Sequence, residues 1–214
     1  MSILVTGFDR GCEAVNASQA LVDSLRDDLP PELTPWRSKL HFAILPLSSR
    51  DIGDALAAEL ETCRPRYGVF TGQARGRNRI ELERLATNLL DFESADAMNM
   101  QPRGERIEPS GPAACWSTLP NQARMVEGLN ARGIPAALSN HAGNHLCNQL
   151  LYLALRRGQQ NESAPDCGFV HIPPLPQQLR SQWPESPFMP LEMTRAALVE
   201  ILLALLQPTP EVSL

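Results

Sequence analysis

The chain has 214 residues, a formal net charge of −5 and five cysteines, and these numbers exclude several classes of protein. Its length suffices for one domain with a sizeable core, and 43% apolar with 20% charged residues is typical of a folded globular protein. The acidic balance and the lack of a basic stripe argue against a nucleic-acid partner, and no window approaches the roughly 20 apolar residues of a membrane span. Because the apolar run at residues 3–5 is too short for a signal peptide, we expect a cytoplasmic protein with reduced thiols.

Apolar segments and helix breakers alternate along the whole chain. The pattern predicts strands at residues 2–6, 40–45, 67–71, 134–138 and 167–172. It predicts helices at residues 16–25, 122–131, 144–157 and 191–206 and a further helix that runs to Cys63. Asn16 is the predicted N-cap of the first helix, and Ser48 with Asp51 is the predicted capping pair of the helix that runs to Cys63. Strands that alternate with helices of about ten residues or more indicate βαβ units and a sheet covered on both faces.

One segment, residues 80–90, fits two structures. Leu82, Leu85 and Leu89 have helical spacing, but the preceding strand and glycine loop suit an extended partner. Periodicity alone does not decide between a helix and a strand here.

Cys147 is the residue whose position most suggests chemistry. It follows Gly143 in the first turn of the helix predicted at residues 144–157, where the helix dipole favours a thiolate. The dipole contributes about 0.3–1 kcal/mol, which is too little to bring a thiol pKa of about 8.5 below neutral. A charged histidine would have to supply the rest, and His171, at the end of a predicted strand, is the candidate partner and proton shuttle. A buried carboxylate would orient its ring.

Each of these residues also has an ordinary structural interpretation. A cysteine early in an apolar helix is commonly a small core residue, and a histidine at a strand end commonly satisfies a local hydrogen bond. A metal site is a further alternative, although the spacing matches no standard zinc cluster; its ligands would be His141, His145, Cys147 and His171. The remaining thiols have no comparable setting and are expected to be inert; these are Cys12, Cys63, Cys115 and Cys167.

Several motifs then appear in a fixed order along the chain. They are VTGFD at 5–9, GQARGR at 72–77, ERLATNL at 83–89, GPAACWSTLP at 111–120 and GFVHIP at 168–173, with Cys147–Asn148 between the last two. Together they resemble the type I pyroglutamyl peptidases (pyrrolidone-carboxylate peptidases), cysteine peptidases that remove an N-terminal pyroglutamyl residue. The resemblance extends from Ile3 to about Gln178.

The resemblance implies a catalytic role for three residues. By position, Cys147 is the nucleophile, His171 the general base and Glu83 the acidic third member. Glu81 occupies a neighbouring position that the family usually fills with a small polar residue, so the acid is assigned to Glu83. The implied mechanism is acyl transfer without metal or cofactor, and the backbone N–H of Cys147 is the expected oxyanion donor.

The resemblance also implies a fold and a substrate pocket. The fold is a single α/β domain over residues 1–214, a three-layer α/β/α sandwich around a mixed, mostly parallel sheet, with residues 80–88 extended. The expected substrate-binding residues are Phe8, Asn16, Gln73, His145 and Leu146.

The pocket departs from the family pattern at four places. The loop Asp9–Cys12 is one residue shorter and lacks a second phenylalanine, Leu47 replaces threonine, Glu93 replaces arginine and His145 replaces phenylalanine. Much of the apolar lining for a flat lactam ring is therefore lost, which would change affinity and choice of substrate.

We therefore expect a cytoplasmic cysteine exopeptidase that releases an N-terminal pyroglutamyl group from a peptide or small amide, assembled as a homodimer or homotetramer. Two alternatives stay open. His145 and the short Asp9–Cys12 loop suit a cysteine amidohydrolase for a different cyclic or blocked amide. Glu93 suits a non-catalytic binding protein on the same scaffold.

Overall fold

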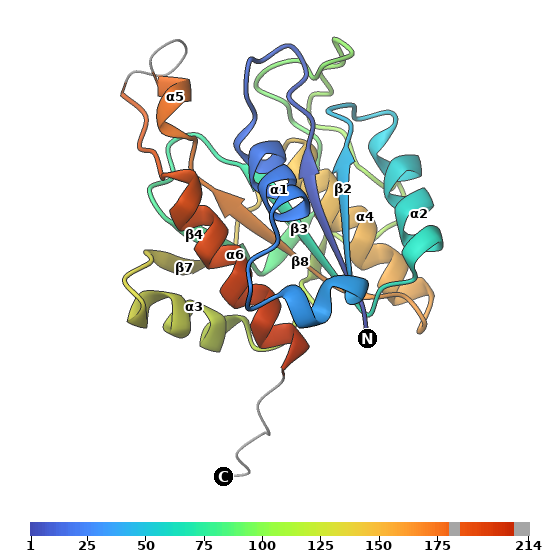
Figure 1. The fold of residues 1–214 in the computed structure, drawn as a ribbon. Helices are drawn as coiled ribbons and strands as arrows, with labels where there is room; N and C mark the ends of the chain where they lie inside the picture. The colour runs from blue at the N-terminus through green and yellow to red at the C-terminus, as the bar shows by residue number, and fades with distance from the viewer. Residues whose placement is uncertain (180–184, 208–214) are drawn as a thin grey trace.

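The structure, a computed structural model, describes residues 1–179 and 185–207 and is built on a six-stranded sheet with the order β2-β1-β3-β8-β4-β7 (Figure 1). The pairing is parallel throughout this sheet except between β4 and β8, which are antiparallel. A short antiparallel pair, β5 with β6, lies beside it. The strands are β1 (Ile3–Phe8), β2 (Leu40–Leu45), β3 (Tyr67–Gln73), β4 (Ile80–Glu83), β5 (Leu85–Thr87), β6 (Ala114–Trp116), β7 (Ala136–Ser139) and β8 (Asp166–Ile172).

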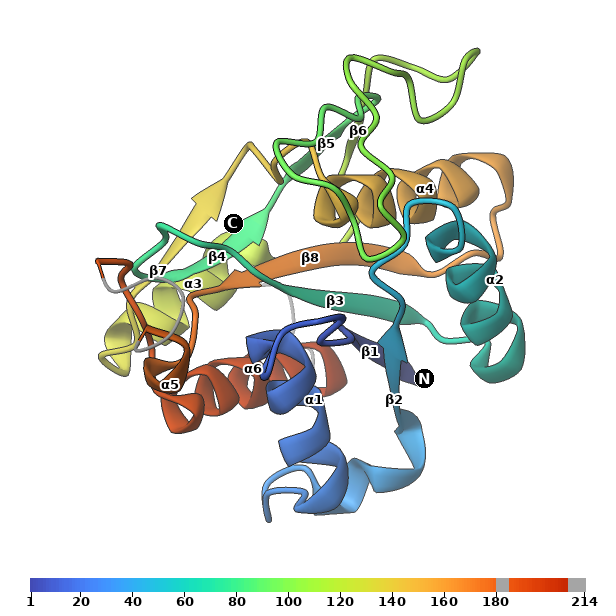
Figure 2. The same cartoon turned by 90° about the horizontal axis from the view of Figure 1, so that it is seen from above.

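Helices cover both faces of the sheet. Figure 2 shows one face covered by α1 (Ala17–Asp27), α3 (Gln122–Ala131) and α6 (Leu191–Leu206), and the other by α2 (Ile52–Cys63) and α4 (Leu146–Gln160). Two short segments, the 3-10 helix η1 (Thr34–Lys39) and α5 (Pro176–Leu179), complete the described elements. The predicted fold class, an α/β/α sandwich around a mixed and mostly parallel sheet, is confirmed. No described helix is long and apolar enough to span a membrane.

The two cores arise from the side-chain alternation of buried strands. In β1, Ile3 and Val5 join the core under α1, α3 and α6, while Leu4 and Phe8 join the core under α2 and α4. Burial on both sides favours apolar residues at successive positions, which explains the run Ile3–Val5 in β1, although the buried Thr6 follows it.

Hydrogen bonds tie the start of α1 to the end of β1 across the loop of residues 9–16. Asn16 is the N-cap, as predicted, and its side chain accepts the N–H of Ser18 at 2.9 Å. The Ser18 hydroxyl in turn accepts the N–H of Phe8 at 3.0 Å. A Cβ atom at Gly7 would lie 2.5 Å from the carbonyl oxygen of Ser18, so only glycine allows this approach. These contacts fix Phe8 and Asn16 side by side at the end of β1.

Some local predictions differ from the structure. Ser48 and Asp51 do bond to each other, at 2.6 Å between Oγ and Oδ2, but α2 begins only at Ile52 and Asp51 caps it without a side-chain bond to the helix. Residues 80–83 and 85–87 are extended as β4 and β5, close to the 80–88 that the family resemblance implied and against their helical spacing. The short elements η1, β6 and α5 were not predicted.

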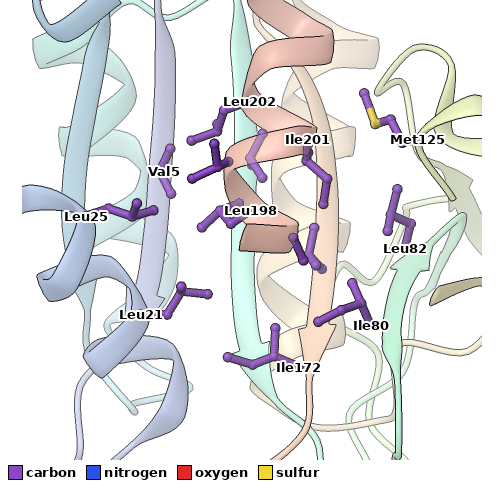
Figure 3. Close-up of a cluster of buried hydrophobic side chains, with 14 of the residues drawn as sticks. Val5, Leu21, Leu25, Ile80, Leu82, Met125, Ile172, Leu198, Ile201 and Leu202 are labelled. Carbon is purple, nitrogen blue, oxygen red and sulfur yellow. The ribbon is translucent and has the colours of Figure 1, made fainter. Parts of the chain in front are cut away.

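The interior face of α6 carries much of the larger core, and Figure 3 shows Leu202 within it. Leu202 is fully buried, whereas its neighbour Leu203 is only partly buried. We expect Leu202→Ala to reduce the free energy of unfolding by about 2–5 kcal/mol, because it leaves a cavity in a close-packed core. Urea unfolding should show a clearly smaller loss for Leu203→Ala. Equal losses for the two variants would contradict the assigned face of α6.

Candidate active site

A cavity of about 510 Å³ opens where β1 and β3 end, next to the start of α4. In an α/β sheet such crevices at strand ends are the usual ligand sites. The structure places every expected substrate-binding residue in its lining, together with the thiol-bearing residue: Phe8, Asn16, Gln73, His145, Leu146 and Cys147. Residues that are far apart in sequence thus meet at one surface.

Cys147 is the second residue of α4 and reaches toward the middle of the sheet. A Cβ atom placed on Gly72 would lie 2.9 Å from its Sγ atom and 2.6 Å from the Phe169 ring. Only a glycine in β3 therefore lets the thiol pack so closely on the strand. Gly72 is paired with His171 in the parallel ladder of β3 and β8, so the thiol lies over the strand next to the imidazole.

His171, in β8, and Glu83, in β4, form a buried pair and are not among the residues that line the cavity. The Nδ1 atom of His171 lies 2.7 Å from Oε1 of Glu83, and both side chains are shielded from solvent. An ionised carboxylate only accepts hydrogen bonds, so Nδ1 carries the proton and donates it. The Nε2 atom of His171 is therefore left with a lone pair that can act as a base.

The antiparallel register explains how Glu83 reaches His171. Glu81 lies directly opposite His171, and Glu83 lies opposite Phe169, so Glu83 approaches the imidazole along the diagonal. Glu81 is held instead by Arg77 and by Arg79, whose Nε atom is 3.0 Å from Glu81 Oε1. The assignment of the acidic role to Glu83 remains a prediction, and this geometry supports it.

Burial and charge set the resting protonation states. Burial opposes ionisation of Glu83, but the hydrogen bonds from His171 and Ser139 and the charge of Arg77 outweigh it, so the pKa of this carboxyl lies below its usual value. Burial lowers the pKa of His171 despite the opposing effect of Glu83. Burial and the nearby charge of Glu83 raise the pKa of the Cys147 thiol to about 12. These directions favour a neutral thiol and a neutral imidazole in the free site, although Cys147 is only partly buried where it lines the cavity; the charged histidine expected beside Cys147 stays a prediction.

The His145 side chain makes its contacts with Phe92 and Ser94. Its ring stacks on Phe92 with centroids 3.8 Å apart, and its Nε2 atom lies 3.1 Å from the carbonyl oxygen of Ser94. A carbonyl oxygen only accepts, so Nε2 donates to it. Burial lowers the pKa of His145, which keeps the ring neutral. His145 thus fixes the segment that carries the exposed Glu93 along the rim of the cavity.

Several supporting residues were not singled out from the sequence. Gln178 donates to Gln73 Oε1 at 2.7 Å. Asn148 bonds both backbone groups of Thr87 at 2.8 Å and so ties the start of α4 to β5. Arg77 links the carboxylates of β4 to the chain after β7. Arg77 and Asn148 belong to the motifs that resemble the family and Gln178 does not, and the motifs alone did not indicate these contacts.

The other thiols and the metal alternative have little support in the geometry. Cys115 and Cys167 are buried, Cys63 is partly buried, and Cys12 is exposed at the cavity mouth. The described residues contain no group of three His, Cys, Asp or Glu side chains arranged to hold a metal ion. Two of the histidines of the metal alternative, His145 and His171, instead make hydrogen bonds to Ser94 and Glu83.

A thiol at a helix start that lines a cavity, next to an imidazole oriented by a carboxylate, defines a candidate cysteine hydrolase. The family model for pyroglutamyl peptidase matches residues 1–207. The chain belongs to the pyroglutamyl peptidase family, and is accordingly a cysteine peptidase of the pyroglutamyl type.

Individual relatives agree with this assignment. The pyrrolidone-carboxylate peptidase of Chromobacterium violaceum is 37% identical over 178 residues, which are 83% of this chain and 80% of the relative. That of Bacillus thuringiensis is 35% identical over 91% of this chain and 87% of its own. The crystal structure of pyroglutamyl peptidase I from Bacillus amyloliquefaciens superposes with a TM-score of 0.83 at 32% identity, covering 94% of both chains. A mutant pyrrolidone carboxyl peptidase from Pyrococcus furiosus gives 0.85 at 30% identity, covering 98% of this chain and all of its own.

The contact between Gly72 and Cys147 yields a steric prediction. We expect Gly72→Ala to displace the thiol or the Phe169 ring and to lower kcat/KM about 100-fold, because small misplacements of reacting groups are costly. The matched control is Gly128→Ala in α3, where an added methyl meets no atom within 4 Å. It should keep full activity and gain up to about 1 kcal/mol in stability. Equal activity of both variants would contradict the assigned position of the thiol.

Proposed function

We propose that this protein is a cytoplasmic cysteine exopeptidase that releases the N-terminal pyroglutamyl group of peptides, with Cys147, His171 and Glu83 as its catalytic residues. The observation that carries the proposal is the Cys147 thiol, which lines the cavity and packs on Gly72 next to the His171–Glu83 pair. We further infer that residues 1–214 form one such domain and that it assembles as a homodimer or homotetramer.

The neutral resting pair defines the order of the chemical steps. The Cys147 sulfur attacks the carbonyl carbon that links the pyroglutamyl ring to the peptide, while His171 Nε2 takes the thiol proton. His171 then gives that proton to the leaving amine as the C–N bond breaks and a thioester remains. Water attacks the thioester with His171 again as base, and pyroglutamate leaves as the thiol regains its proton. Glu83 holds the imidazole and stabilises its charged form in each half-reaction.

The start of α4 supplies the charge stabilisation that acyl transfer requires. The backbone N–H groups of the first helical turn have no partner inside the helix, and Cys147 is the second residue of that turn. Its N–H is therefore available to the oxyanion that forms on the attacked carbonyl. The helix dipole adds to this effect because it too favours negative charge at the helix start.

Two side-chain amides of the cavity suit a lactam ring. Gln73 uses Oε1 to accept from Ala17 and Gln178, and Asn16 uses Oδ1 to accept from Ser18. Within the described part of the chain, these bonds leave the NH₂ groups of Gln73 and Asn16 able to donate to the lactam carbonyl. Phe8 adds an apolar surface for the ring.

Purified protein should hydrolyse pyroglutamyl-aminomethylcoumarin without added metal, and Cys147→Ala should lose the activity completely. Cys63→Ala is the matched control, since that thiol is remote from the cavity lining, and it should keep full activity. Iodoacetamide should inactivate the wild type and the control alike. A reactive Cys147 without turnover of this substrate favours the amidohydrolase for another amide. Identical behaviour of wild type and Cys147→Ala on a broad panel of blocked amides would eliminate the enzymatic proposal.

The acid limb of the pH profile reports the state of His171. Its pKa is lowered from the ordinary value of 6.5, so the imidazole stays an unprotonated base down to mildly acidic pH. Activity should be full above pH 6.5 and be lost only as the pH falls through the lowered pKa of His171. The measurement is kcat/KM against pH at constant ionic strength. A midpoint above 6.5 would show that protonated His171 is favoured in the free enzyme and contradict the neutral pair.

A further inference from the structure

A second carboxylate, Glu81, lies beside the proposed catalytic pair and takes no part in the reaction described above. It is directly opposite His171 in the antiparallel pairing of β4 with β8. Directly opposite residues project from the same face of a sheet, as do residues two apart in a strand, so Glu81, Glu83 and His171 share one face. The side chain of Glu81 is only 11% exposed. A carboxylate in this place would compete with Glu83 for the imidazole unless other groups held it.

Two arginines hold Glu81 away from His171. Arg77 pairs with Glu81 Oε2, and Arg79 Nε lies 3.0 Å from Glu81 Oε1. The same guanidinium of Arg77 lies 3.0 Å from Glu83 Oε1. Arg77 is itself fixed, because it donates to the Ser139 hydroxyl at 3.2 Å and to the His141 carbonyl at 2.7 Å. Arg77 is therefore a rigid bridge between two carboxylates.

The charges of this cluster balance. Arg77 and Arg79 oppose Glu81 and Glu83, so the group is neutral before His171 gains a proton. Among the described residues, the other titratable groups around the imidazole are His141, in the loop after β7, and Cys147, at the start of α4. Without Glu81, both guanidiniums would face one carboxylate, and excess positive charge would oppose protonation of His171.

We propose that Glu81 is a positioning residue that takes up the charge of Arg79 and part of that of Arg77, so that Glu83 remains available to hold His171 and stabilise its imidazolium. This inference rests on the proposed function, since the imidazolium forms during acyl transfer. It assigns opposite effects to the two partners of one ion pair. Removal of the Glu81 charge disfavours the imidazolium, and removal of the Arg79 charge favours it.

The test compares Glu81→Gln with Arg79→Gln by NMR titration of the His171 imidazole in the full-length protein, with kcat/KM profiles measured in parallel. We expect Glu81→Gln to move the His171 midpoint to lower pH and Arg79→Gln to move it to higher pH. With Glu81→Gln, kcat should fall about 3- to 10-fold at unchanged KM, because the base is weaker. Glu81→Asp, which keeps the charge, should restore most of the loss. The Arg79 side chain is 49% exposed, so we expect the fold to tolerate its substitution. If Glu81→Gln does not fold, the His171 titration in Arg79→Gln alone tests the proposal.

A remote charge provides the control. Glu61→Gln removes one carboxylate at a side chain that is 74% exposed and paired with Arg157, and it should leave the His171 titration unchanged. Shifts in the same direction for Glu81→Gln and Arg79→Gln, or no shift in either, would overturn the positioning role. Because the titration needs no turnover, a wild type with the expected titrations but no pyroglutamyl hydrolysis would refute the proposed function and leave the role of Glu81 standing.

Discussion

The antiparallel pairing of β4 with β8 is the constraint on which the site depends. β4 enters between β8 and β7 against the direction of β8, and its register sets Glu81 opposite His171 and Glu83 opposite Phe169. A slip of one residue would turn both carboxylates to the other face of the sheet, where the apolar core under α1, α3 and α6 lies. Leu82, which alternates with them, is buried in that core and opposes the slip. The packing of an apolar residue thus fixes the geometry of two ionised ones.

The thiol depends on a second close approach, at Gly72. β3 is the neighbour of β8, so the helix start that packs on Gly72 brings Cys147 next to His171. The same burial that brings these groups together suppresses their charges, which gives a neutral thiol beside a neutral imidazole. Catalysis in such a site relies on proton transfer during attack, and on Glu83 and the helix start to stabilise the charges that appear.

Much of the fold was predictable because long amphipathic segments specify their own structure. The bounds of β2, α3 and α6 agree with the predicted residues 40–45, 122–131 and 191–206. Segment 80–90 was not decided by its pattern, because its leucines fit a helix, while the burial of Leu82 in the central strand β4 depends on partners far away in sequence. β6 escaped prediction because it is three residues long within a polar, proline-bearing stretch.

The candidate site was predictable only in part. The family motifs named Cys147, His171 and Glu83, and the structure brings Glu83 to His171 and Cys147 over the adjacent strand. The motifs carried no information on which carboxylate Arg77 and Arg79 would hold, because that depends on sheet register. The protonation states could not be predicted either. The sequence indicates the helix dipole at Cys147, but it does not indicate burial, which has the larger effect on the pKa of the thiol.

The central claim is that Cys147 rests as a thiol and is ionised only during attack. Its most direct test is the ultraviolet absorbance of the thiolate, titrated in the free wild type and corrected with the same titration of Cys147→Ala. The account predicts no thiolate of Cys147 at neutral pH and its appearance only in strongly alkaline solution, toward the raised pKa of about 12. A thiolate of Cys147 that is already present at neutral pH would contradict it.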